Sequence, residues 1–187
     1  MKRPEPIDKE ILLDPKRYIV SKTDPKGIIE YGNDYFVEIS GYSETELVGQ
    51  PHNIIRHPDM PKIAFKMMWD RIQRRENFMA LVKNLSKEGF YYWVVTEFET
   101  KLDPLTNEII GYTAFRKAAP RDAIRKIEPL YGKLLEIEKI GGMDASEKYL
   151  KGYLEERNVT YDDFIDDIVG NKGVFKAFFK VMKKMFQ

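Results

Sequence analysis

The chain has 187 residues, 43% of them hydrophobic and 13% aromatic, which is enough to bury one substantial core beside a smaller appendage. Its 31 basic and 30 acidic residues give a net charge of +1, so no global field recruits nucleic acid. The absence of cysteine excludes disulfides, thiolate metal sites and cysteine nucleophiles. No stretch reaches the roughly 18 apolar residues of a spanning helix, and the N-terminus lacks an apolar signal core. We therefore expect a cytoplasmic protein.

The first two thirds of the chain predict a sheet with helices on one side. Strands are indicated by alternating and β-branched runs bounded by turn residues, and helices by the spacing of apolar residues and by capping pairs such as Ser43 with Glu46. The expected elements, in chain order, are strands at 17–24 and 27–33, short helices from Asp34 and at 43–47, an irregular loop at 49–62, a helix at about 61–75, and strands at 77–86, 91–100 and 109–117. This order is typical of an α+β fold.

The last third of the chain reads as a helical extension. A helical stretch at 120–138 with an interruption near Pro129 is followed by a break at Gly141–Gly142. Further helical runs are expected at about 144–157, 160–169 and 173–186. We place the domain boundary near Pro120, which gives a leader at 1–16, a sensor domain at 17–119 and a helical extension at 120–187.

Three segments carry a resemblance to a known family. They are NDYFVEISGYSETELVGQPHNIIRHPDMPKIAFKMMWDRI, VKNLSKEGFYYWV and GYTAFRK. Together they resemble the PAS sensor domain of bacterial aerotaxis and energy-taxis receptors over about residues 17–134, and the GQPHN-x-x-RHPDMPK loop is the most specific element. The resemblance implies a PAS fold, an antiparallel sheet flanked by short helices, that binds FAD non-covalently and reports its redox state to the chemotaxis machinery. Because membrane and kinase-controlling regions are missing from the sequence, it resembles a stand-alone sensor that signals to a separate transducer.

Arg56, His57 and Asp59 place a cation, a titratable donor and a carboxylate in one loop. Such a cluster suits the polar edge or the pyrophosphate of a flavin nucleotide, and the resemblance implies that all three residues contribute to FAD binding. The alternative from the residues alone is a loop locked by an Arg56–Asp59 ion pair, with His57 exposed.

Asn33, Asn84 and Trp69 complete the expected cofactor site. Both asparagines match the family pattern, and Asn84 is a polar amide inside an apolar strand, where it must find a partner. Without the resemblance, Asn33 would be an ordinary helix cap, and Trp69 is as easily explained by core packing as by contact with a ring system.

The missing motifs argue against an enzyme. The sequence has no glycine-rich phosphate loop after a strand and no G-x-S-x-G, and His52 and His57 are not spaced for zinc. A haem-binding PAS gas sensor remains an alternative because one histidine can ligate haem, and a cofactor-free PAS interaction module is a second alternative.

The segment 173–186 is a basic amphipathic helix. One face carries Phe175, Phe178, Phe179, Met182 and Phe186, and the other carries mostly lysines. The aromatic face either packs on the chain's own domain or docks elsewhere, on a chemotaxis transducer or receptor or on the anionic inner face of the membrane. A homodimer is also left open.

Overall fold

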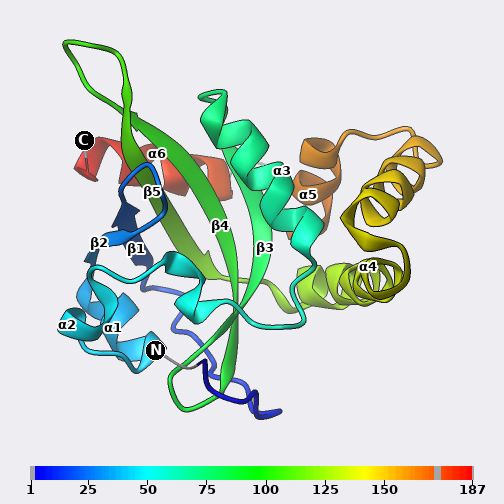
Figure 1. Cartoon of the computed structure of the whole chain (residues 1–187), viewed down its shortest axis with the longest axis horizontal. Helices are drawn as coiled ribbons and strands as arrows, with labels where there is room; N and C mark the ends of the chain where they lie inside the picture. Colours follow the sequence, from blue (N-terminus) through cyan, green and yellow to red (C-terminus); the bar gives the residue numbers. More distant parts are fainter. Residues whose placement is uncertain (1–2, 171–173, 187) are drawn as a thin grey trace.

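The structure is a computed structural model that describes residues 3–170 and 174–186. Its centre is a five-stranded antiparallel sheet with the strand order β2-β1-β5-β4-β3 (Figure 1). The strands are β1 (Ile19–Thr23), β2 (Ile29–Gly32), β3 (Phe78–Leu85), β4 (Tyr91–Leu102) and β5 (Ile109–Ala118). All five strands expected from the sequence are confirmed, and so is the fold class.

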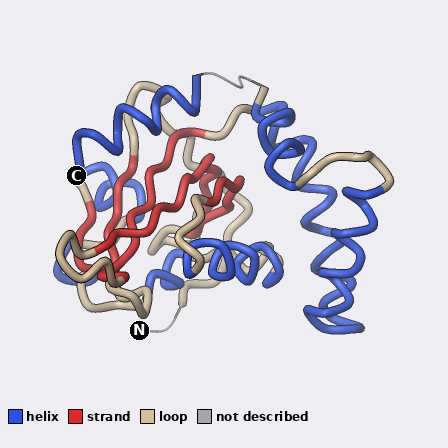
Figure 2. Tube along the Cα trace, turned by 90° about the horizontal axis from the view of Figure 1, so that it is seen from above, coloured by secondary structure: helices blue, strands red, loops and turns tan. Residues whose placement is uncertain are grey.

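The helices between β2 and β3 lie on one side of the sheet. They are α1 (Asp34–Ser40), α2 (Glu44–Leu47), the 3-10 helix η1 (His52–Ile55) and α3 (Lys62–Gln73). The capping box at Ser43 forms as the sequence predicts. The expected irregular loop contains η1 but is otherwise non-helical. Figure 2 shows that α3 and the C-terminal helix α6 (Val174–Phe186) cover opposite sides of the sheet.

The register of the sheet decides which side chains meet α3. Residues opposite one another in antiparallel strands point to the same face. Asn84 pairs with Tyr92, and Thr96 pairs with Arg116, so all four side chains share the α3 face. Trp93, one residue along, points to the other face and stacks on Tyr131 with ring centroids 6.4 Å apart.

The C-terminal extension consists of α4 (Arg121–Glu155), α5 (Tyr161–Val169) and α6. The expected interruption near Pro129 is wrong, because α4 continues through that residue. The expected break at Gly141–Gly142 is confirmed, because the chain departs from helical geometry at Gly142, with φ 73° and ψ −172°. Pro129 is on the solvent-exposed side of the helix, where water can satisfy the carbonyl that loses its N–H partner. The glycine adopts the positive φ without a Cβ penalty.

The aromatic face of α6 packs on the chain's own sheet. Phe179 and Met182 are buried, and the Phe178 ring lies 5.9 Å from the Tyr18 ring. Lys117 of β5 lies over the Phe178 ring. The packing alternative is therefore confirmed for these residues, while the side chain of Phe186 lies outside the described part. No described helix is long and apolar enough to cross a membrane.

One hydrophobic core runs through both parts of the chain. It includes Val94 and Phe115 from the sheet, and Ile127, Ile165 and Phe179 from the helical extension. The predicted boundary near Pro120 coincides with the start of α4, but the core continues across it. The division into a sensor domain and an extension stays a prediction.

Candidate functional site

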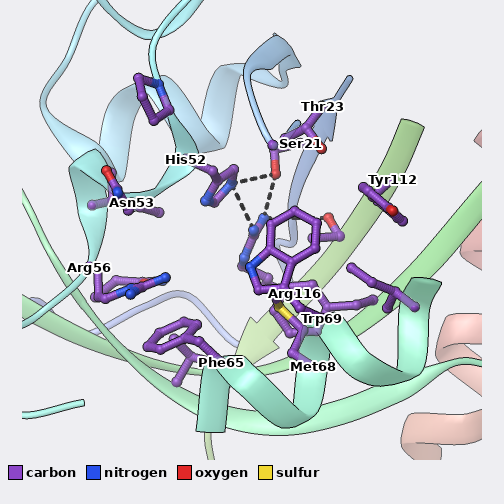
Figure 3. Close-up of a pocket in the computed structure, with 18 of the residues that line it drawn as sticks. Ser21, Thr23, His52, Asn53, Arg56, Phe65, Met68, Trp69, Tyr112 and Arg116 are labelled. Carbon is purple, nitrogen blue, oxygen red and sulfur yellow. Dashed lines mark hydrogen bonds between the residues drawn. The ribbon is translucent and has the colours of Figure 1, made fainter. Parts of the chain in front are cut away.

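A cavity of about 160 Å³ lies between the sheet and α3 (Figure 3). The sheet supplies its floor, α3 one wall, and the segment around η1 the other. Its lining includes Ser21, Thr23, Gly27, His52, Asn53, Arg56, Phe65, Met68, Trp69, Val82, Asn84, Tyr112 and Arg116. Lys26 also lines the cavity, but no aspartate or glutamate within residues 3–170 and 174–186 does.

The segment that carries His52 and Arg56 is fixed to the sheet at both ends. Pro51 forms an isolated bridge with Ile28, and Arg56 forms one with Asn84. The Arg56 backbone thus continues the sheet beside β3. This pairing positions the side chains of η1 and Arg56 over the cavity.

Arg116 and His52 form a hydrogen-bonded group at the base of the cavity. The Arg116 guanidinium donates to the Ser21 hydroxyl oxygen at 2.9 Å and lies 3.0 Å from Nε2 of His52. Because a guanidinium can only donate, Nε2 of His52 accepts and the proton of the neutral ring is on Nδ1. Burial and the Arg116 charge lower the pKa of His52 to about 3, so the imidazole is neutral at physiological pH.

Two positive charges in the cavity lack a carboxylate partner. Burial lowers the pKa of Arg116 to about 10, and burial together with Arg3 does the same for Arg56. The Arg56 guanidinium stacks on Phe65 at 3.5 Å, and its Nε has no hydrogen-bond partner among the described residues. Buried charges are normally paired, since an unpaired one loses solvation without compensation. The cavity therefore favours a ligand with negative charge or strong acceptors.

Polar side chains on the α3 face of the sheet have few partners. The Thr96 hydroxyl is buried without a hydrogen bond among the described residues. The Asn84 amide and the Tyr92 hydroxyl, which are opposite one another on β3 and β4, are also buried and interact with each other. Burial raises the pKa of the Tyr92 hydroxyl more than the Asn84 contact lowers it, so the hydroxyl stays protonated. Because an amide has two N–H groups, Asn84 can still donate one of them to a ligand.

Trp69 forms the aromatic part of the wall. Its ring meets that of Tyr112 edge to face, with centroids 5.4 Å apart, and it lies against Gly27. A Cβ at Gly27 would come within 3.2 Å of the Trp69 ring, and the glycine has a φ of +81°. The turn before β2 therefore requires glycine for the ring to take this place.

Of the six predicted site residues, Arg56, Trp69 and Asn84 line the cavity. Asn33 is outside it and caps α1, because its side-chain oxygen accepts from the backbone N–H groups of Phe36 and Val20. The helix-cap interpretation of Asn33 is thus confirmed. Contact of any of these residues with FAD stays a prediction.

His57 and Asp59 are also outside the cavity lining, and they hold the loop in place. Nδ1 of His57 accepts from the Asp59 N–H at 3.1 Å, and the Asp59 carboxylate pairs with Lys83 at 2.8 Å. The alternative of an Arg56–Asp59 ion pair with an exposed His57 is therefore wrong, since Asp59 bonds to Lys83 and His57 is buried. Burial and the Lys83 charge lower the pKa of His57 to about 4, so this ring is neutral at physiological pH.

Sequence reasoning missed Ser21, His52 and Arg116 as cavity residues. Arg116 is on the same face of β5 as Tyr112, which also lines the cavity, so alternation along this strand is a usable signal. His52 precedes Arg56 in the same loop but was judged only as a zinc or haem ligand. Nothing in the sequence marks Ser21.

Comparison with known proteins agrees with this architecture. The family model described as the PAS fold matches residues 29–108. The chain is 43% identical over 118 residues to the aerotaxis receptor of Escherichia coli K12, a match that covers 62% of this chain and 22% of the receptor. It is 26% identical to a nitrogen fixation regulatory protein of Klebsiella pneumoniae, over 52% of this chain and 20% of that protein. The chain thus spans about a fifth of the length of these curated relatives.

Solved structures show the same fold. A light-oxygen-voltage domain studied with a flavin analogue superposes with a TM-score of 0.52 at 18% identity, covering 59% of this chain and 82% of that one. The light-oxygen-voltage domain of the blue-light photoreceptor aureochrome 1 gives a TM-score of 0.51 at 20% identity, covering 65% of this chain and 90% of that one. The sheet and its flanking helices are a PAS domain whose sequence is similar to that of the aerotaxis receptor.

Proposed function

We propose that this chain, which carries a PAS domain similar to that of the aerotaxis receptor, is a redox sensor for energy taxis. It binds FAD non-covalently in the cavity below α3 and signals the redox state of the flavin to a separate chemotaxis transducer in the cytoplasm. It carries out no substrate reaction of its own.

The unpaired positive charge of the cavity is the observation that carries this proposal. Arg56 and Arg116 are buried or half-buried without a carboxylate partner among the described residues, and the Asn84 amide nearby, which interacts with Tyr92, has a second N–H that can donate to a ligand. FAD offers what these groups lack, because its pyrophosphate is anionic and its pyrimidine edge has carbonyl acceptors. Guanidinium forks and amide donors suit both kinds of group.

Five of the lining residues have chemistry that suits parts of FAD. Arg56 and Arg116 would hold the negative or electron-rich parts of the ligand, and Asn84 would donate to an acceptor on it. Trp69 and Phe65 offer flat faces for a ring system. Bound FAD supplies reversible electron transfer. A change in the charge and protonation of the ligand alters the hydrogen bonds that these residues make, which shifts the conformational equilibrium by a coupling of typically ~1–3 kcal/mol.

A cofactor-free interaction module is the second candidate, because the cavity is small. Its volume of about 160 Å³ is below the roughly 300–1,000 Å³ usual for small-molecule sites, so bound FAD requires side chains at the mouth to move. Arg56, Phe65 and Trp69 are partly exposed there and have room to do so. The haem alternative has weaker support, since Nε2 of His52 already accepts from Arg116 and His57 does not line the cavity.

The absorption spectrum of the untreated purified protein separates these candidates. We expect a flavin spectrum with about one FAD per chain. Arg56→Ala should weaken FAD binding about 10- to 100-fold, the usual effect of losing a charge-assisted contact. Arg125→Ala is the matched control, because that guanidinium is exposed on α4 and pairs with Asp122. A colourless protein that takes up no added FAD, or equal retention in the Arg56 and Arg125 variants, contradicts the proposal.

A further inference from the structure

The helix that walls the cavity begins without a cap of its own. Pro61 is at the N-cap position of α3 and makes no side-chain cap bond, and the first turn contains no acidic residue. The cap is supplied by α4 instead. The two carboxylate oxygens of Glu138 accept from the backbone N–H groups of Lys62 and Ile63, both at 2.9 Å. A carboxylate at this end also interacts favourably with the helix dipole.

The same carboxylate reaches across the break in α4. The Ser146 hydroxyl, which follows the non-helical Gly142, shares its one proton between Oε1 of Glu138 at 3.1 Å and the Met143 carbonyl oxygen at 2.8 Å. One side chain therefore joins the start of α3 to both halves of α4. Ser146 is fully buried and Glu138 is half-buried, which shields these contacts from competing water.

Two ion pairs connect the rest of α3 to the C-terminal helices. Lys66 pairs with Glu147 of the second half of α4 at 3.3 Å, and Arg71 pairs with Asp162 in the first turn of α5 at 2.9 Å. Both pairs are partly exposed and weak individually. Together with the Glu138 cap, these ion pairs join α3 to the C-terminal extension at its beginning, middle and end. The same helix lines the cavity with Phe65, Met68, Trp69 and Ile72.

We propose that Glu138 is a positioning residue that couples the cavity helix α3 to the second half of α4, so that the C-terminal helices report the state of the cavity. The inference rests on the proposed function for the identity of the ligand, but the coupling itself is a property of the ligand-free chain. A ligand that displaces α3 alters the geometry at Glu138, and by reciprocity a change at Glu138 alters ligand affinity. Removing a helix cap should change the equilibrium constant between the ordered and the disordered form of that helix end by about 2- to 30-fold.

Hydrogen exchange of the ligand-free protein tests the coupling directly. In Glu138→Ala, we expect exchange to accelerate by about 2- to 30-fold both at the first turn of α3 and over 143–155. Glu138→Gln keeps an acceptor oxygen and should show a smaller effect, which also guards against misfolding of the alanine variant. Glu136→Ala is the matched control, because Glu136 is exposed on the same helix and pairs with Lys133. Acceleration confined to the first turn of α3, or an equal effect in the Glu136 variant, would overturn the coupling.

Adding FAD tests whether the coupling carries a signal. We expect FAD to slow exchange over 143–155 in the wild-type protein and to have little effect there in Glu138→Ala, while that variant still binds FAD with affinity reduced by at most about 30-fold. An unchanged response over 143–155 in Glu138→Ala contradicts the inference. If wild-type protein binds no FAD, the proposed function fails, and the ligand-free comparison decides the coupling by itself.

Discussion

Replacing Arg116 by methionine should leave the ligand-free protein about as stable as the wild type and make it a weaker FAD binder. Arg116 is 2% exposed and has no carboxylate partner among the described residues. Methionine keeps an unbranched side chain of comparable length but carries no charge. In most cores, removing a hydrogen-bonded side chain lowers the free energy of unfolding. Here we expect almost no loss of stability, because burial of the charge offsets the hydrogen bonds that the guanidinium makes.

The magnitude follows from the environment of the guanidinium. Burial lowers its pKa to about 10, which corresponds to roughly 3 kcal/mol of unfavourable energy for the charged form. The variant loses charge-assisted hydrogen bonds to Ser21 and His52, at roughly 1.5 kcal/mol each at the lower end of the usual range. These two partners keep a contact with each other, with Oγ and Nε2 2.9 Å apart. The two contributions offset one another, so the net expectation is a change of less than about 1 kcal/mol in ligand-free stability, together with a loss of about 10- to 100-fold in FAD affinity.

Urea denaturation of flavin-stripped protein measures the first quantity, and fluorescence titration with FAD measures the second. Arg116→Lys is the control, because it keeps the charge and should not gain stability. The reasoning would be refuted if Arg116→Met were less stable than wild type by 1 kcal/mol or more, or if its FAD affinity were unchanged. A variant at least as stable as the wild type that keeps normal FAD affinity would show that the buried charge plays no part in FAD binding.

Two further predictions concern stability. Burial lowers the pKa of His52 to about 3 and of His57 to about 4, whereas both titrate near 6.5 in the unfolded chain, so the unfolded state takes up protons first as the pH falls. The free energy of unfolding, measured in urea, should therefore drop between pH 7 and pH 5 by on the order of 1–2 kcal/mol per histidine. The variant His57→Asn should show a smaller drop. If the drop is the same in this variant, the assignment of a neutral buried His57 ring is wrong. Phe179→Ala should cost about 3–5 kcal/mol because the ring is buried between α6 and the sheet, whereas Val181→Ala on the exposed side of α6 should change thermal unfolding little. Equal losses in these two variants would mean that α6 does not pack through its aromatic face.

The secondary structure was predictable because its signals are local. Alternating residues at 77–86 and 91–100, the capping box at Ser43 and the glycines after helices each act over a few positions, and the structure follows them. Pro129 misled the prediction because the cost of a helical proline depends on whether water reaches the freed carbonyl. That depends on which side of α4 packs inward. The helical spacing of Ile124, Ile127, Leu130 and Leu134 marks the inward side and leaves Pro129 on the opposite one, so the sequence held a signal that the proline rule outweighed.

Only part of the cavity lining was predictable, because strand pairing brings together residues that are far apart in the sequence. Ser21 comes beside Arg116 because β1 pairs with β5, and His52 reaches both because its loop bridges back to the strand region at Ile28. No local pattern encodes that pairing. The RHPD loop was recognised as a unit, yet its members separate, with Arg56 at the cavity and Asp59 bonded to Lys83 behind β3. Neighbouring residues in an irregular loop can face in different directions, so adjacency in sequence is weak evidence for a shared ligand.

The sign of the ligand's charge is the clearest example of what composition conceals. The chain has almost equal numbers of acidic and basic residues, and its net charge predicts no preference for anions. The fold distributes these charges unequally, since Lys26, Arg56 and Arg116 line the cavity and no carboxylate from the described part of the chain does. An internal field depends on which few groups are desolvated together, and the remaining charges contribute little because water screens them. The family resemblance implies a flavin nucleotide. The guanidiniums without a carboxylate partner among the described residues favour any ligand that is anionic or rich in hydrogen-bond acceptors. FAD meets both requirements, which is why Arg116→Met is the more informative substitution: it removes the most deeply buried positive charge of the cavity and leaves the recognised loop unchanged.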